Sequence, residues 1–172
     1  AVQFFREPRM SIYDGHSWTT LSKEDMAVNE YGMRLYATDP VSIAVDPNDP
    51  DHYYIATYCD GLFEYNHGAV TRYGHGVNGS TIKLVDDGGY YHTYFYEYTR
   101  TDGTMMDEEG NLWVMNATSI GQPIHVMTPN HQWYGLQLRN NGSKVVLETP
   151  AALRTDNRDS HFKWFLDQRK ND

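Results

Sequence analysis

Cysteine, basic residues and long apolar runs are all scarce in this sequence. Cys59 is the single cysteine among 172 residues, so no disulfide can form within the chain, and we interpret it as a small half-buried residue beside a turn. Fourteen Lys and Arg residues stand against 23 Asp and Glu, which gives a formal net charge of −9. Such a chain has no basic patch to displace counterions from phosphates, which argues against nucleic acid as a partner. No apolar run approaches the roughly 18 residues of a membrane span, so none is expected in this segment.

Helical periodicity is scarce as well. Only LSKEDMAVNEYGMRL, residues 21–35, supports a helix, with Ser22 as a candidate cap three residues before Asp25. The rest of the chain consists of short apolar or aromatic runs separated by Gly, Asn, Asp and Pro, which is typical of an all-β repeat. Aromatic residues make up 14% of the chain, a content that favours packed β-structure over disorder.

A repeated unit appears when two stretches of the sequence are aligned. SIAVDPNDPDHYYIATY (42–58) and TMMDEEGNLWVMN (104–116) each contain an apolar strand ending in Asp, an acidic turn and a second buried strand. The following element also recurs, as GLFEYNHGAV (61–70) and PIHVMTPNHQW (123–133), and MSIYDGHSW (10–18) is interpreted as an earlier copy of this back half. A faint copy of the front half lies at 152–167, where Asp156 precedes Phe162, Trp164 and Phe165.

The repeat predicts a β-propeller. Its period is about 50 to 60 residues with about four strands per unit, as in a propeller blade, whereas a solenoid or sandwich is the alternative. We expect a single partial propeller of about three four-stranded units: a partial blade at 1–20, blades at about 41–73 and 102–138, and a partial blade at about 144–167. Ile55 and Trp113 are expected on equivalent strands, facing neighbouring blades. The residues that define the repeat are Trp18, Asp46, Ile55, Gly61, Asp107, Gly110, Asn111, Trp113, Trp133 and Trp164.

Incomplete units at both ends predict that the chain is part of a longer propeller. A propeller arc leaves sheet edges and apolar inter-blade faces open to water. The remainder of a longer chain would cover these faces. The alternatives are a second copy, or a small three-blade ring in which the strands near Ile12 and Phe165 pair.

The motifs D-x-x-GNLWV and DP-x-DP-x-x-x-Y-I-x-T-x-x-x-GLFEY resemble the two-component-regulator propeller repeats of Bacteroidetes. Within that group the similarity is greatest to the propeller component of the type IX (Por) secretion system, over residues 40–138 and more weakly over 150–167. The resemblance implies a non-catalytic binding or scaffold segment, in the periplasm or at the cell surface of a Gram-negative bacterium, with a protein or glycan partner. No kinase, tyrosine-rich module or C-terminal sorting domain accompanies these motifs. The alternatives are the ligand-sensing propeller of a periplasmic hybrid two-component sensor and the propeller of a carbohydrate-active enzyme.

Two segments contain candidate binding residues. The loop DPNDPD provides Asp46, Asp49 and Asp51, whose carboxylates could bind calcium, although the two prolines also specify a structural turn. In YYHTYFYEYTR (90–100), Tyr94, Tyr96 and Tyr98 fall on one face of a strand. Such a row could stack on sugar rings or anchor a protein, although packing between blades is the favoured interpretation.

Catalytic motifs are not supported. GHGVNG (74–79) has the G-x-G-x-x-G form, but a strand and a turn follow it instead of the helix that a dinucleotide site requires. No nucleophile is flanked by an obvious base, and the paired carboxylates fall in turns. We therefore expect a protein that is not an enzyme and that uses no cofactor, calcium excepted.

Overall fold

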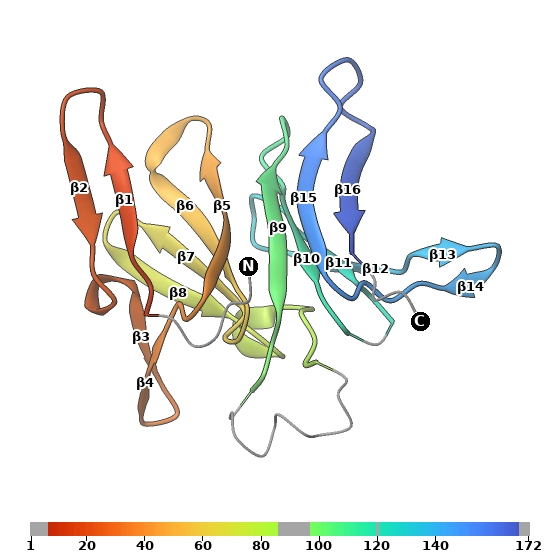
Figure 1. Ribbon diagram of the computed structural model, residues 1–172, viewed down its shortest axis with the longest axis horizontal. Helices are drawn as coiled ribbons and strands as arrows, with labels where there is room; N and C mark the ends of the chain where they lie inside the picture. The colour runs from red at the N-terminus through yellow and green to blue at the C-terminus, as the bar shows by residue number, and fades with distance from the viewer. Residues whose placement is uncertain (1–6, 86–96, 120, 169–172) are drawn as a thin grey trace.

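The computed structural model describes residues 7–85, 97–119 and 121–168, and this part of the chain is all-β. Its helical elements are two short 3-10 turns, η1 (Glu24–Met26) and η2 (Val77–Gly79). Every pairing between its strands is antiparallel, except for one isolated bridge between Asp60 and Thr99. The sheets follow one another around an arc, so the fold is a partial propeller (Figure 1).

Two four-stranded sheets form the centre of the molecule. In each sheet the strands lie in sequence order, as in a propeller blade. The first sheet contains β5 (Pro40–Asp46), β6 (Asp49–Thr57), β7 (Leu62–Asn66) and β8 (Ala69–Tyr73). The second contains β9 (Thr101–Met106), β10 (Leu112–Asn116), β11 (Ile124–Met127) and β12 (Trp133–Leu136).

Two-stranded hairpins flank these sheets. Before the first sheet come β1 (Met10–Tyr13) with β2 (Trp18–Leu21), and β3 (Ala27–Glu30) with β4 (Met33–Tyr36). After the second come β13 (Arg139–Asn140) with β14 (Ser143–Lys144), and β15 (Pro150–Thr155) with β16 (Lys163–Asp167). The strands that contain Ile12 and Phe165 belong to separate sheets, so the small three-blade ring is not formed.

The predicted helix at 21–35 is wrong. Asp25 does accept hydrogen bonds from the backbone and hydroxyl of Ser22, both at 2.8 Å, but the turn they cap continues only to Met26. The chain then forms the β3–β4 hairpin, whose loop residues Tyr31 and Gly32 have φ of 53° and 75°. Positive φ at both loop positions is what a type I′ hairpin turn requires. Burying Met26 against the first sheet outweighs the weak helical propensity of so short a segment.

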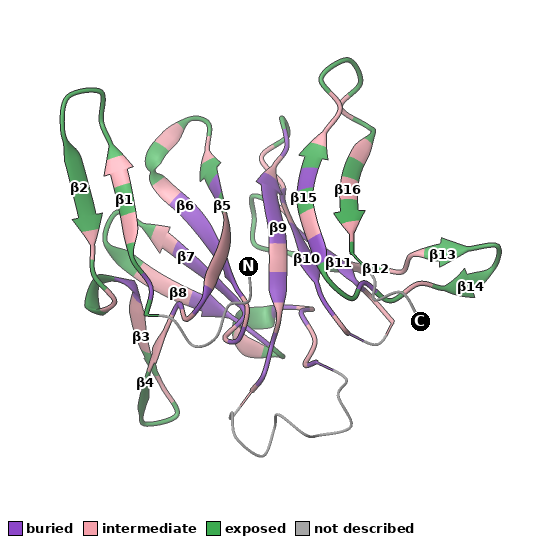
Figure 2. Cartoon of the chain, viewed as in Figure 1, coloured by how far each residue is buried: buried purple, intermediate pink, exposed green. Residues whose placement is uncertain are grey.

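Three apolar layers fill the spaces between successive units. Strand side chains alternate between faces, so Tyr54 and Ala56 point toward the second sheet while Tyr53 and Ile55 point toward the first hairpins. The central strands are buried on both faces, whereas β2 and much of β16 are exposed (Figure 2). The middle layer contains Ala44, Tyr54, Ala56, Leu62, Tyr73, Ile82, Leu112, Val114 and Met127.

Ile55 and Trp113 both lie on the second strand of a sheet, but on opposite faces. Ile55 packs toward the first hairpins, and Trp113 packs toward the last hairpin. The side chain that corresponds to Trp113 is Tyr54, because the turn after Asp46 is longer by two residues than the turn after Asp107. An even insertion preserves the face on which the aromatic residue lies.

The hairpin at 10–18 takes a front position, whereas its sequence was interpreted as a back half. Met10 lines a pocket together with Pro40 and Ile43, so β1 faces β5 across this pocket. Strands β5, β9 and β15 are the first strands of their units and lie in contact with one another. Asp14 and Trp18 therefore repeat the Asp-turn-Trp order of the front hairpins.

Candidate interaction site

Two of the front hairpins share a hydrogen-bonded pair of side chains. Trp113 donates its indole N–H to Asp107 at 2.7 Å, and Asn111 donates its side-chain and backbone N–H groups to the same carboxylate. Burial acts to raise the pKa of Asp107, but these hydrogen bonds outweigh it, so the pKa is lowered. In the last hairpin, Trp164 donates to Asp156 at 3.1 Å. The Asp and Trp of the sequence motif therefore form one unit that fixes the indole.

The two indoles differ in their surroundings. Trp113 packs against the layer containing Leu147 and Leu153, and the ammonium of Lys163 lies 5.0 Å from the centre of its ring. Trp164 is 60% exposed, and Leu166, on the same face of β16, is 61% exposed. Trp164 is therefore open to solvent, whereas the equivalent Trp113 in the second sheet is covered by the unit that follows it.

The opposite end of the arc is also apolar and open. Trp18 on β2 is 69% exposed, and its ring lies 5.1 Å from that of Tyr13, centre to centre. Exposed aromatic clusters of this kind mark surfaces for protein contacts. We name the exposed side chains Tyr13 and Trp18 the first end face, and Phe162, Trp164 and Leu166 the last end face.

A buried carboxylate connects the strands of the first sheet. Glu64 accepts the hydroxyls of Tyr54 at 2.9 Å and Tyr73 at 2.7 Å, and His52 Nε2 lies 2.8 Å from it. Burial acts to raise the pKa of Glu64, but these contacts outweigh it and the pKa is lowered. The hydroxyl of Tyr73 also lies 3.3 Å from His131 Nδ1, which connects the network to the second sheet. These structural contacts occupy both carboxylate oxygens of Glu64.

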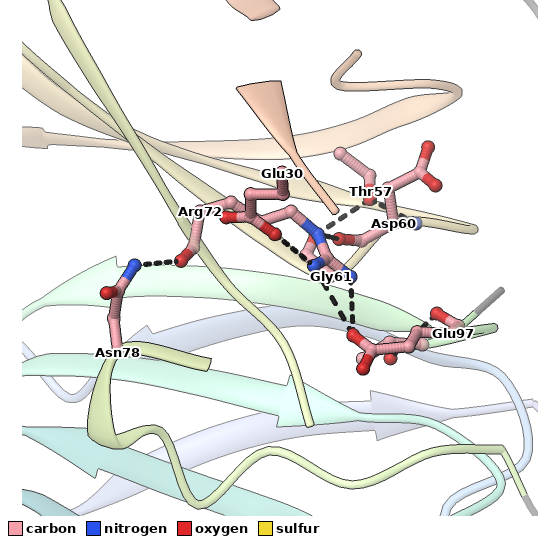
Figure 3. Close-up of polar contacts among 8 residues, drawn as sticks. Glu30, Thr57, Asp60, Gly61, Arg72, Asn78 and Glu97 are labelled. Atoms are coloured by element: carbon pink, nitrogen blue, oxygen red, sulfur yellow. Dashed lines mark hydrogen bonds and ion pairs between the residues drawn. The ribbon is translucent and has the colours of Figure 1, made fainter. Parts of the chain in front are cut away.

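Arg72 is the centre of a second buried network (Figure 3). Its guanidinium donates to Glu30 at 2.9 Å, to Glu97 at 3.4 Å and to the carbonyl of Asp60 at 2.6 Å. Only 2% of the Arg72 side chain is exposed. The β3–β4 hairpin, the first sheet and the segment before β9 are thereby held together by one fully compensated cation.

His125 is buried in the second sheet and is uncharged at neutral pH. Its ring nitrogens lie 2.8 Å from the hydroxyl of Thr81 and 3.2 Å from the side-chain carbonyl of Asn116. Burial, with a smaller contribution from the charge of Lys83, lowers the pKa of His125 to about 3. Asn116 in turn donates to the carbonyl of Arg100, so this network fixes the backbone that enters β9.

A groove lies along the first strands of three units. It has a volume of about 540 Å³ and lies at the edge where β5, β9 and β15 run side by side (Figure 1). Its polar lining side chains are Ser42, Tyr58, Arg100, Asp102, Thr104, Thr149 and Arg154.

The carboxylates of the DPNDPD loop form turn contacts. Asp46 accepts the backbone N–H of Asn48, and Asp49 accepts that of Asp51 and lies 2.8 Å from His67 Nε2. Among the described residues, no three His, Cys, Asp or Glu side chains gather in a way that could hold a metal ion. Calcium binding by Asp46, Asp49 and Asp51 stays a prediction, and the contacts favour the structural turn.

The tyrosine row is only partly described. Tyr98 is 4% exposed and packs with Cys59 and Val85, so it belongs to the core. Tyr94 and Tyr96 lie outside the described residues, and a binding role for them stays a prediction. Cys59 is 3% exposed, and burial raises the pKa of its thiol to about 12, which makes it an unreactive core residue.

Sequence reasoning missed Glu64, Arg72 and Arg100. Glu64 and Arg72 each stand inside a strand that is otherwise largely apolar or aromatic, FEY and TRY. A charged residue at a strand position that faces the core has to be paired, and this signal could have located both networks. No signal of this kind marks Arg100, which precedes its strand.

Comparison with known proteins gives one structural similarity that bears on function. No protein-family model matches the chain, and no curated protein matches it. Among solved structures, the chain is similar to PorZ of Porphyromonas gingivalis, described as an essential bacterial surface component of the type-IX secretion system, with a TM-score of 0.70 and 25% sequence identity. The similarity covers 90% of this chain and 19% of PorZ, so the chain spans about a fifth of that protein. No helix within the described residues is long and apolar enough to cross a membrane.

Proposed function

We propose that this chain is a non-catalytic binding or scaffold segment of a β-propeller protein related to type IX secretion, working outside the cytoplasm at the bacterial cell surface. The observation that carries the proposal is the similarity to PorZ over 90% of the chain at a TM-score of 0.70. It supports type IX secretion over the two alternatives, a periplasmic two-component sensor and a carbohydrate-active enzyme.

The polar networks support a scaffold role. Glu64 and Arg72, two of the buried charged groups, have their hydrogen bonds filled by neighbouring side chains and a backbone carbonyl. Groups engaged in this way hold units together and have little capacity left for substrate. Within the described residues, the geometry therefore favours binding over catalysis.

The two end faces support a place inside a larger propeller. Trp164 has the same hydrogen-bonded geometry as Trp113 but lacks the cover that Trp113 receives from the next unit. A further blade, from the remainder of a longer chain, would supply that cover at both end faces. The burial gained there would be worth about 25 cal/mol for each Å² of apolar surface removed from water.

The test is made in the source bacterium. A tagged protein containing this chain should be accessible to added protease on intact cells. Deleting the 172-residue segment should leave type IX cargo proteins trapped in the periplasm. A matched strain carrying Lys144→Ala, an exposed substitution away from both end faces, should secrete normally. Protection of the tag in intact cells, or normal secretion after the deletion, would refute the proposal.

A further inference from the structure

Arg100 is a partly buried cation whose surroundings, among the described residues, include no carboxylate partner. Its guanidinium lies over the ring of Tyr58, 4.1 Å from the ring centre, and its Nε is buried without a hydrogen-bond partner. Within residues 7–85, 97–119 and 121–168, no carboxylate lies within ion-pair distance of it. Its backbone is fixed, since its carbonyl accepts the side chain of Asn116 and the N–H of Ala117.

The contrast with Arg72 shows what Arg100 lacks. Arg72 has two glutamates and a carbonyl around its guanidinium, whereas Arg100 has an aromatic ring alone. A contact with a tyrosine ring compensates a cation only weakly, by less than the loss of part of its hydration costs. An anionic hydrogen-bond acceptor from outside the described residues would give the Arg100 guanidinium the compensation that Arg72 has.

Arg100 lines the groove, and the backbone of the groove is irregular on all three strands. The ladder of β5 shifts between Pro40 and Ser42, and that of β15 shifts between Ala151 and Arg154. The ladder of β9 shifts between Asp102 and Met105, where Gly103 has a φ of 49° and an added Cβ would lie 2.0 Å from Met115 Cε. Bulges gather next to binding sites because they redirect side chains out of the sheet.

The other groups around the groove limit the charge of a ligand. The hydroxyls of Ser42 and Thr104 lie 3.1 Å apart, and Arg154 adds a second, exposed cation. Asp102 is the one carboxylate among the described lining residues, and it accepts the N–H of Gly103 at 2.7 Å. Burial raises the pKa of Asp102 by more than the N–H of Gly103 and the nearby charge of Arg100 lower it.

We propose that this groove binds a carboxylate group of a peptide, with Arg100 as its anchor. The planar guanidinium fork matches a carboxylate, and its contact with the Tyr58 ring restricts the movement of the side chain. A singly charged carboxylate fits better than a phosphate dianion, because Asp102 shares the groove and the chain has a net charge of −9. This inference goes beyond the proposed role in secretion and does not depend on it.

Calorimetric titration of this chain tests the proposal with three peptides that differ in one group. Ac-Ala-Glu-Ala-NH2 has a side-chain carboxylate, Ac-Ala-Gln-Ala has a terminal carboxylate, and Ac-Ala-Gln-Ala-NH2 has neither. Saturable binding of either carboxylate peptide, with none of the amide, is expected, and the stronger of the two identifies the source of the group. Inorganic phosphate is the fourth probe, and tighter binding of phosphate than of both peptides would overturn the proposal.

Three variants assign the binding to Arg100. Arg100→Met should weaken the carboxylate peptides about 10- to 100-fold, because a charged hydrogen-bonded pair is lost. Asp102→Asn should strengthen them, and Arg139→Ala, an exposed arginine on β13, should leave them unchanged. Unchanged affinity in a folded Arg100→Met protein would overturn the assignment. If that variant does not fold, Arg100→Lys and Asp102→Asn make the same test, with weaker binding expected for the first and stronger binding for the second. The absence of both changes would contradict the assignment.

Discussion

Trp113 and Trp164 occupy the same position in two hairpins, yet one is packed and the other is exposed. Both donate their indole N–H to the Asp that directly follows the preceding strand. The difference is the neighbour, because β15 and the layer around Leu153 cover Trp113 while β16 is the last strand described. The hairpin geometry is thus local, whereas the stability gained from the aromatic residue depends on the next unit.

The largest expected effect lies in the interior, at Arg72. Replacing Arg72 by Ala leaves Glu30 and Glu97 facing one another without their cation. Breaking a buried pair in this way should lower the free energy of unfolding by about 3–5 kcal/mol. Urea denaturation followed by circular dichroism measures it. A loss as small as that of Arg158→Ala, whose side chain is 86% exposed, would show that the network contributes little.

Trp113→Ala should have the next largest effect. It removes a half-buried ring from the layer against the last hairpin and leaves Asp107 without its indole donor. We expect a loss of about 3 kcal/mol, at the lower end of the range for a buried aromatic residue. The same denaturation experiment checks it, and Trp113→Phe separates the lost packing from the lost hydrogen bond.

His125 makes the interior sensitive to acid. Its pKa is about 3 in the folded protein and about 6.5 when unfolded, so between these pH values the unfolded chain binds more protons. The free energy of unfolding should therefore fall as the pH falls below 6.5, by up to about 1.4 kcal/mol per pH unit from this group. Urea titrations at several pH values should show a shallower pH dependence for His125→Gln than for the unmodified chain. His161→Gln, on the last hairpin, is the control, and equal slopes for both variants would contradict the prediction.

Trp164→Ala should have the smallest effect on the isolated chain. Because the ring is exposed, the expected change in the free energy of unfolding is below about 0.5 kcal/mol. Its role should appear in association instead. We expect the isolated chain to associate through the exposed last end face, and analytical ultracentrifugation should show less association for Trp164→Asp than for the unmodified chain. A Trp164→Ala loss equal to that of Trp113→Ala would remove the distinction between the two positions.

Patterns within one hairpin could be predicted, and contacts between units could not. The order Asp, turn and aromatic residue located the hairpins because an Asp that caps a turn and an alternating strand are both local. The helix at 21–35 was wrong since the burial of Met26 against the first sheet decided that segment. The faces of Ile55 and Trp113 were not distinguished, because the alignment did not count the two extra residues of the DPNDPD turn.

The candidate sites divide in the same way. The sequence locates Asp46, Asp49 and Asp51 in a turn, and the carboxylates of Asp46 and Asp49 bond within that loop and, for Asp49, to a histidine of the adjacent hairpin loop. Tyr98 was grouped with a binding face by strand alternation, but the structure packs it with Cys59. The groove at Arg100 brings together side chains from β5, β9 and β15 with Tyr58, Arg100 and Thr149, a set that no local pattern connects.

Alternation, turn residues and composition are enough to predict the all-β class, the repeated hairpin and the acidic net charge. Which aromatic residues are covered, which buried charges are compensated and where the groove lies follow from the tertiary contacts. Burial and charge compensation are properties of neighbours that are distant in sequence, and the spacing of residues within one strand carries no information about them.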